Sequence, residues 1–206
     1  MNITLDDFGL NKTTNREIHK WTQTKKVDFV SLLTNLPSTD EAIQIYKKDT
    51  KKNYKLGLHF NLVEGKPLCK KSEVPSLVDK RGDFYLLPYF IIRLFLGMIK
   101  KEDVMKELQK QYEVMENAHV PCNHINSHQN IHVFHFMYSC INEFAQKNNI
   151  QYVRQVVSVK NRFKKFPLTY VAFIFLYFIS SLIFTSHKYK PTQFVETSFH
   201  PGTTYD

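Results

Sequence analysis

The chain has 206 residues, of which 43% are hydrophobic and 23% charged, the proportions of an ordinary globular protein and not of a disordered one. The formal net charge is +9, but the lysines are scattered and accompany no nucleic-acid-binding motif, so we expect no nucleic-acid partner. The 3 cysteines have no C-x-x-C spacing, which argues against a disulfide framework or a zinc knuckle. Reduced cysteines and an N-terminus without a signal-peptide pattern predict a cytoplasmic protein.

The first half of the chain alternates predicted strands with predicted helices. The strands are expected over 2–5, 27–33 and 55–62. The helices between them are expected over 14–24 and 38–52, and each begins with the Ser/Thr-x-x-Glu spacing of a capping box. A polar connection over 63–87 follows the third strand, and a loop of this length is usually functional.

The second half continues the pattern. Further helices are expected over 88–98, 101–117 and 134–147, and further strands over 124–128, 151–157 and 193–198. This alternation predicts a parallel sheet covered by helices, either open or closed into a β/α barrel. Because an eight-stranded barrel needs ~250 residues, we expect one domain over 1–206 whose barrel is incomplete at the C-terminus.

The stretch 166–186 is apolar and carries no charge, which meets the length criterion for a membrane-spanning helix. The alternative is a helix buried in the protein. Candidate site residues lie on both sides of this stretch in the sequence, so a membrane span would divide the site. We therefore prefer the buried helix and keep membrane association only as the alternative.

Polar clusters fall at the ends of predicted strands, where the loops of a parallel β/α fold gather reactive groups. The first cluster is Asp6-Asp7. Neighbouring strand residues point to opposite faces, but a turn at Gly9 can bring both carboxylates to the mouth of the fold. A divalent cation would relieve their repulsion by binding one of them, and the other could then serve as a general base.

The densest cluster is the histidine-rich run 124–132. On a strand, His124, Asn126 and His128 would share one face, whereas on a helix the histidines would form one stripe. Pro121 favours an extended start. With Asp7 and His59, His128 makes up one carboxylate and two imidazoles, a ligand set for a divalent ion that leaves positions open for water.

These segments together resemble the YdjC-like (ChbG-type) carbohydrate deacetylases. The matching segments are 6–10, 57–68, 124–128 with His132, and 199–202. The resemblance implies a distorted, TIM-like β/α barrel related to NodB-type deacetylases. It also implies hydrolysis of N-acetyl groups on amino sugars such as chitooligosaccharides, assisted by Mg²⁺ or Zn²⁺.

The resemblance also assigns roles to individual residues. It implies Asp7, His59 and His128 as metal ligands, and Asp6 as the base that deprotonates water. His200 would protonate the leaving amine or hold the substrate. The remaining polar residues of the run would support the ligands or contact the substrate; they are His124, Asn126 and His132.

One position departs from the family pattern, because Asn126 stands where the family usually has Asp. An amide still accepts a hydrogen bond from an imidazole but supplies no negative charge, so metal affinity could fall. Two alternatives to the deacetylase therefore stay open: a homologue that binds metal or carbohydrate without turnover, and a metal-dependent hydrolase of another bond, such as a phosphoester. The expected partner is an acetylated amino sugar, and a homodimer also stays open.

Overall fold

A parallel β-sheet forms the centre of the molecule in the computed structural model, which describes residues 3–154 and 198–199. Its strands are β1 (Thr4–Phe8), β2 (Phe29–Leu32), β3 (Lys55–Phe60), β4 (His124–Ser127), β5 (Tyr152–Val153) and β6 (Ser198–Phe199). They lie in the order β5-β4-β3-β2-β1-β6, and every neighbouring pair is parallel. Each of β1 to β5 therefore lies beside its neighbour in the sequence.

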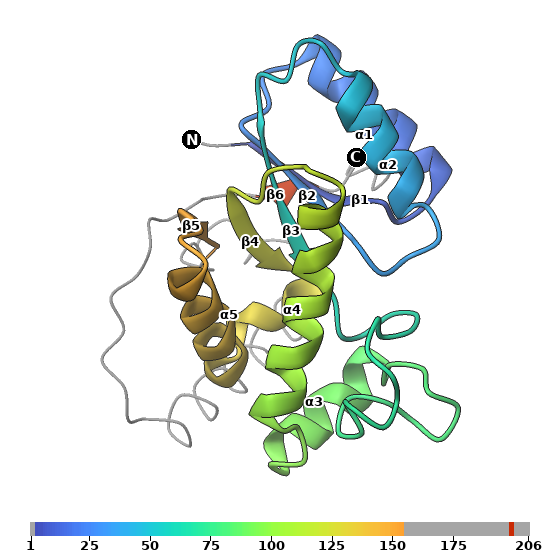
Figure 1. Ribbon diagram of the computed structural model, residues 1–206, viewed down its shortest axis with the longest axis vertical. Helices are drawn as coiled ribbons and strands as arrows, with labels where there is room; N and C mark the ends of the chain where they lie inside the picture. Colours follow the sequence, from blue (N-terminus) through green and yellow to red (C-terminus); the bar gives the residue numbers. More distant parts are fainter. Residues whose placement is uncertain (1–2, 155–197, 200–206) are drawn as a thin grey trace, which may run out of the picture.

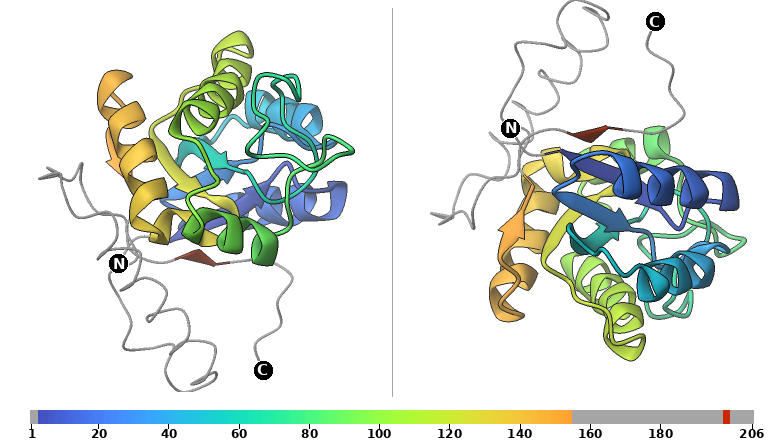
Figure 2. Two further views of the ribbon diagram at one scale, coloured as in Figure 1. Left: turned by 90° about the horizontal axis from the view of Figure 1, so that it is seen from below. Right: turned by 90° about the horizontal axis from the view of Figure 1, so that it is seen from above.

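Helices lie around the outside of this sheet, as the two end-on views in Figure 2 show. They are α1 (Lys12–Thr24), α2 (Thr39–Lys48), α3 (Leu87–Phe95), α4 (Lys101–Asn117), α5 (His135–Lys147) and the 3₁₀ segment η1 (His128–Val133). In Figure 1, α1 and α2 lie together at one end of the molecule, and α3 lies at the other. Each crossover from β1 to β5 contains at least one helix, as parallel neighbours require.

The residues of β1 to β4 are almost all buried. All four residues of β2 and of β4 are buried, although β2 is mostly apolar and β4 carries His124, Asn126 and Ser127. Leu5, Val30, Leu56 and Ile125 are fully buried and belong to one hydrophobic cluster. This packing fixes the strands and thereby their polar carboxyl ends.

The predicted parallel α/β architecture is confirmed, and all six predicted strands overlap observed ones. The sixth strand pairs with β1, so the end of the chain returns to its beginning, as in a barrel. Within the described residues no pairing joins β5 to β6, and closure of the barrel stays a prediction.

Several element boundaries differ from the predictions: β1 ends at Phe8 and not at residue 5, and α2 ends at Lys48 and not at residue 52. Helix α1 begins at Lys12 because the Asn11 side chain accepts a hydrogen bond from the Thr14 backbone N–H at 2.9 Å, so Asn11 and not Thr14 is the cap. Strand β4 ends at Ser127, one residue earlier than predicted. His128 opens η1, in which Gln129 and Asn130 have left-handed φ angles of 50° and 58°.

No helix within residues 3–154 is long and apolar enough to cross a membrane. The predicted helix over 166–186 lies outside the described residues.

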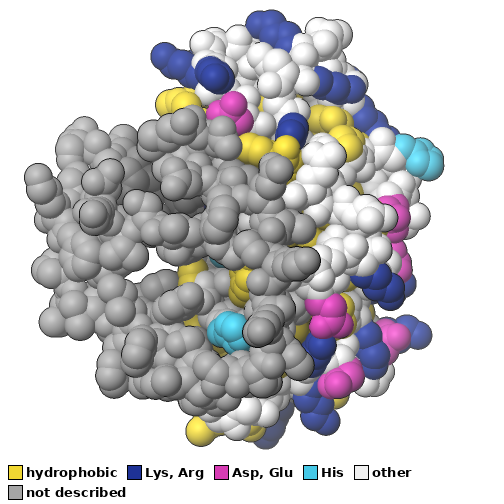
Figure 3. All heavy atoms as spheres, turned by 90° about the vertical axis from the view of Figure 1, so that its left-hand side faces the viewer, with side chains coloured by type: hydrophobic (Ala, Val, Ile, Leu, Met, Phe, Trp, Pro, Cys, Tyr) yellow, Lys and Arg dark blue, Asp and Glu magenta, His cyan; other side chains and the backbone are white. Residues whose placement is uncertain are grey.

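Four exposed lysines lie at the edge of the sheet where the strands begin. Lys25 and Lys26 precede β2, and Lys51 and Lys52 precede β3, so these four side chains lie opposite the carboxyl ends. Figure 3 shows Lys and Arg side chains at the end of the molecule that carries α1 and α2. Figure 3 shows Lys and Arg side chains toward the opposite end as well, and Lys66, Lys70 and Lys71 are exposed on the loop after β3, so positive charge lies at both ends of the molecule.

Candidate metal centre

A bulge in β1 directs two adjacent carboxylates to different partners. Between Leu5 and Phe8, β1 has one more residue than the paired part of β2. Asp7 lies in the bulge with a φ of 66°, a left-handed conformation that costs about 1 kcal/mol for a residue with a Cβ. The turn predicted at Gly9 is present, with a Gly9 φ of 100° and a hydrogen bond from the Leu10 N–H to the Asp7 carbonyl at 3.0 Å, but the bulge before it is what separates the two carboxylates.

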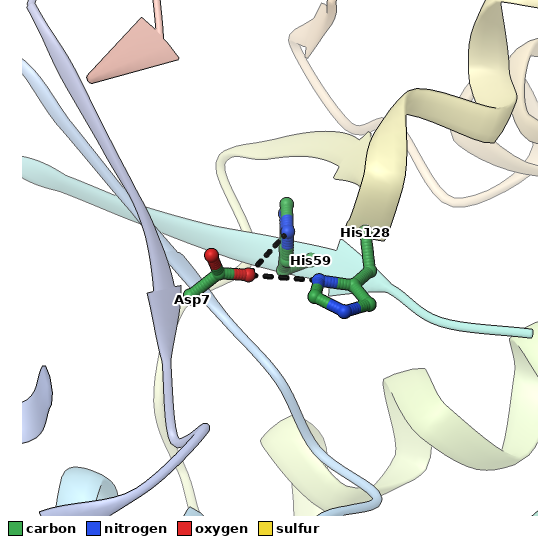
Figure 4. Close-up of side chains that lie close together, drawn as sticks. All are labelled: Asp7, His59 and His128. Atoms are coloured by element: carbon green, nitrogen blue, oxygen red, sulfur yellow. Dashed lines mark hydrogen bonds and ion pairs between the residues drawn. The ribbon is translucent and has the colours of Figure 1, made fainter. Parts of the chain in front are cut away.

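Asp7, His59 and His128 come together from the carboxyl ends of β1 and β3 and the start of η1 (Figure 4). The Asp7 Oδ1 atom lies 3.1 Å from His59 Nε2 and 2.8 Å from His128 Nδ1. One candidate ligand atom from each residue lies within 4.8 Å of the other two. Atoms about 3 Å apart can share one cation whose bonds are about 2.1 Å long.

The proton position on His59 follows from its hydrogen bonds. Asn126 Nδ2 donates to Asp6 Oδ1 at 2.7 Å, which turns the amide oxygen toward His59 Nδ1 at 2.6 Å. The amide oxygen only accepts, so Nδ1 carries the proton and Nε2 presents a lone pair. That buried Nε2 atom has no hydrogen-bond partner among the described residues, although Asp7 Oδ1 faces it.

Asp6 is held behind this imidazole by two partners. Arg154, which directly follows β5, donates to Asp6 Oδ2 at 2.6 Å and to Oδ1 at 3.1 Å. Asn126 supplies the third bond. Asp6 is 1% exposed and Arg154 4%, so this ion pair is desolvated and fixed in a two-pronged geometry.

His128 has acidic partners on both nitrogens. Asp7 faces its Nδ1 atom, and Glu64 Oε2 lies 2.8 Å from its Nε2 atom. Burial is the largest single influence on the pKa of His128 and lowers it. The hydrogen bonds and charges of Asp7 and Glu64 together outweigh burial, so the pKa of His128 is raised.

His124 and His132 lie nearby but are almost completely buried, which favours structural support over substrate contact. His124 Nε2 lies 2.9 Å from Ser31 Oγ, and His132 Nδ1 lies 2.7 Å from Ser127 Oγ. Burial, followed by the positive charge of Arg154, lowers the pKa of each histidine to about 3. Gly57 makes room for this layer, because a Cβ there would overlap the His124 ring.

The structure thus brings together three of the sequence candidates, Asp7, His59 and His128, as a group that could hold a metal ion, and places Asp6 and Asn126 directly behind them. Two contributors were missed: Arg154 and Glu64. Arg154 follows the apolar end of a strand, the same signal that singled out Asp6 and His59. His200 lies outside the described residues.

Comparison with known proteins assigns this chain to a family. A family model described as YdjC-like protein matches residues 1–205. A carbohydrate deacetylase from Halalkalibacterium halodurans is 29% identical over 148 residues, which cover 72% of this chain and 60% of that protein. A chitooligosaccharide deacetylase from Serratia marcescens is 28% identical over 149 residues, covering 72% and 56%. The chain thus spans less than two thirds of the length of these relatives.

The fold also resembles that of a solved structure, described as a candidate cellobiose-phosphate cleavage protein from Enterococcus faecalis. The TM-score is 0.69, with 24% sequence identity, over 83% of this chain and 62% of that one. This likeness concerns the fold alone. The match to the family model covers nearly the whole sequence, and the chain therefore belongs to the YdjC-like protein family.

Proposed function

We propose that this protein is a metal-dependent hydrolase that removes N-acetyl groups from amino sugars or chitooligosaccharides. Family membership and relatives named as carbohydrate and chitooligosaccharide deacetylases support the substrate class. The ligand set Asp7, His59 and His128 supports the dependence on a divalent ion.

One observation carries the metal proposal. The Asn126 amide fixes the proton of His59 on Nδ1, so the Nε2 lone pair faces the Asp7 carboxylate oxygen at 3.1 Å. Two acceptors at this distance repel each other unless a cation lies between them. Two imidazoles and one carboxylate favour Zn²⁺, although Mg²⁺ stays a candidate.

The reaction adds water to the acetyl carbonyl carbon and breaks the C–N bond, which yields acetate and a free amine. A divalent ion at this centre would supply Lewis acidity, polarising the carbonyl and acidifying water. Asp7, His59 and His128 would hold the ion and leave positions open toward the mouth of the fold.

We assign the general base to Asp6, because it is the buried carboxylate beside the centre that the ligand set does not use. Arg154 and Asn126 orient its carboxylate and favour the ionised form that a base requires. His200 is our candidate for the acid that protonates the leaving amine.

Acetate release from diacetylchitobiose tests the proposal. The purified protein should release acetate with Zn²⁺ or Mg²⁺ added and should lose this activity in EDTA. His59→Ala and His128→Ala should abolish metal binding, measured by competition with a chromophoric chelator. Folded protein that binds metal but releases no acetate would favour a binding-only homologue over an enzyme.

The variant Asp6→Asn tests the role of the general base independently of metal binding. It should leave metal affinity within about threefold of wild type and lower kcat by about 10²–10⁴, the range for loss of general-base catalysis. Full activity of Asp6→Asn would contradict the assignment of the base.

A further inference from the structure

We propose that Glu64 is a positioning residue that fixes His128 as a metal ligand through Nδ1. The inference rests on the metal centre proposed above and adds a residue outside its ligand set. Glu64 Oε2 lies 2.8 Å from His128 Nε2. An ionised carboxylate only accepts, so Nε2 carries a proton, and metal binding would displace only the proton that Nδ1 shares with Asp7 Oδ1 at 2.8 Å.

The two imidazoles of the centre are held in the same way by different groups. His59 donates its Nδ1–H to the Asn126 amide oxygen, which is fully buried. His128 donates to Glu64, whose side chain is 44% exposed. A metal-binding histidine usually needs an acceptor on its second nitrogen to set its tautomer and ring orientation. Glu64 fills this place for His128.

Hydrogen bonds fix the backbone at Glu64, as expected of a residue that orients His128. Asn61 is fully buried, and its Oδ1 atom accepts hydrogen bonds from the backbone N–H groups of Val63 and Glu64 at 3.0 and 3.1 Å. Its Nδ2 atom donates to the Glu64 carbonyl at 2.8 Å. One side chain thus binds both polar backbone groups of Glu64.

Helix α4 anchors the same loop from outside. Gln111 Nε2 donates to the Asn61 carbonyl at 2.7 Å, and Gln111 Oε1 accepts from the Asn61 N–H at 3.0 Å. One turn earlier, Glu107 accepts from the backbone N–H groups of Leu68 and Cys69 at 2.9 and 3.0 Å. Both side chains are fully buried, so the ends of the Glu64 loop are tied to a regular element.

The experiment measures Zn²⁺ affinity of the full chain by chelator competition, together with the visible spectrum of the Co²⁺-loaded protein. Glu64→Ala should weaken Zn²⁺ binding about 10–100-fold and should shift the Co²⁺ bands, since His128 loses its fixed orientation. Glu64→Gln keeps an acceptor oxygen and should stay within about threefold of wild type. Glu143→Ala, which removes an exposed glutamate paired with Lys101, is the matched control and should change neither readout.

Thermal unfolding in EDTA would verify that each variant folds. Wild-type affinity and an unchanged Co²⁺ spectrum for Glu64→Ala would overturn the inference while leaving the metal centre intact. Equal losses for Glu64→Ala and Glu64→Gln would also overturn it, because they would indicate charge and not the hydrogen bond. A wild-type protein without measurable Zn²⁺ binding would overturn the proposed function itself.

Discussion

The two imidazoles of the centre belong to very different surroundings. The interior arm consists of His59, Asn126, Asp6 and Arg154, all at most 4% exposed. The rim arm consists of His128 and Glu64, where the acceptor is 44% exposed and stands on a loop. Both arms set the proton position of one imidazole, but the interior arm does so with a neutral amide and the rim arm with a carboxylate.

This difference follows from the cost of burying charge. The interior arm already contains the Asp6 carboxylate, which Arg154 neutralises. A second carboxylate at position 126 would face Asp6 Oδ1 at 2.7 Å without a proton to share, whereas an amide donates there and accepts from His59. At the rim, water screens the charge of Glu64, so a carboxylate costs little. Asn126 is thus fitted to its neighbours.

The largest effect should come from breaking the buried pair of the interior arm. Arg154→Met leaves the Asp6 charge desolvated with fewer partners, and we expect the free energy of unfolding to fall by about 3–5 kcal/mol. Urea unfolding monitored by circular dichroism measures it. Lys101→Met, which breaks the exposed pair with Glu143, should cost under about 1 kcal/mol. Similar losses for both variants would contradict the contrast between interior and surface.

A smaller effect is expected where the rim loop joins the interior. Asn61→Ala removes the acceptor of the buried Val63 N–H and should lower the free energy of unfolding by about 1–3 kcal/mol. It should also weaken Zn²⁺ binding, since Glu64 is released. Asn148→Ala, which removes one bond to the Phe144 carbonyl at the end of α5, is the control and should leave Zn²⁺ binding unchanged. If Asn61→Ala is destabilised but keeps full Zn²⁺ affinity, the loop stabilises the fold without supporting the metal centre.

Much of the fold was predictable because strands and helices alternate in hydrophobic pattern. Parallel pairing then places strand ends at one edge, so Asp7 and His59 could be expected together although they are far apart in the sequence. Local chemistry was harder to anticipate. The extra residue in β1 and the positive φ of Asp7 depend on pairing with β2, which no pattern within 2–5 contains.

The partners of the candidate residues were predictable only in part. Asn126 could be named because it lies within the histidine run. Arg154 could have been noted as a polar residue at a strand end, but its pairing with Asp6, 148 residues away, depends on the sheet order. Glu64 stood in a recognised segment, but its contact with His128 depends on how Asn61 folds the loop. Long-range polar contacts need the three-dimensional arrangement.

Acid should lower the free energy of unfolding through His124 and His132, two buried histidines near the interior arm. His124 and His132 have pKa values lowered to about 3, so between pH 3 and 6.5 the unfolded chain binds protons that the folded chain does not. The contribution of these two histidines to the free energy of unfolding is therefore fully present above pH 6.5. It falls as the pH drops, by about 1.4 kcal/mol per pH unit for each histidine. His132→Gln should reduce this slope by one histidine's share in urea unfolding with EDTA. His119→Gln replaces an exposed histidine and is the control. An unchanged slope in His132→Gln would show that His132 is not buried as a neutral imidazole.

The smallest effect concerns the rim arm in the absence of metal. Glu64 is 44% exposed, and its one described side-chain hydrogen bond joins it to His128, so Glu64→Ala in EDTA should change the free energy of unfolding by about 0.5 kcal/mol or less. Asn126→Ala, which removes the corresponding acceptor of the interior arm, should cost several times more, because it removes one buried hydrogen-bond partner from each of His59 and Asp6. If Glu64→Ala proved as costly as Asn126→Ala, the rim arm would be part of the folding core. Its loop would then be a structural element, and its effect on Zn²⁺ affinity could no longer be ascribed to the orientation of a single imidazole.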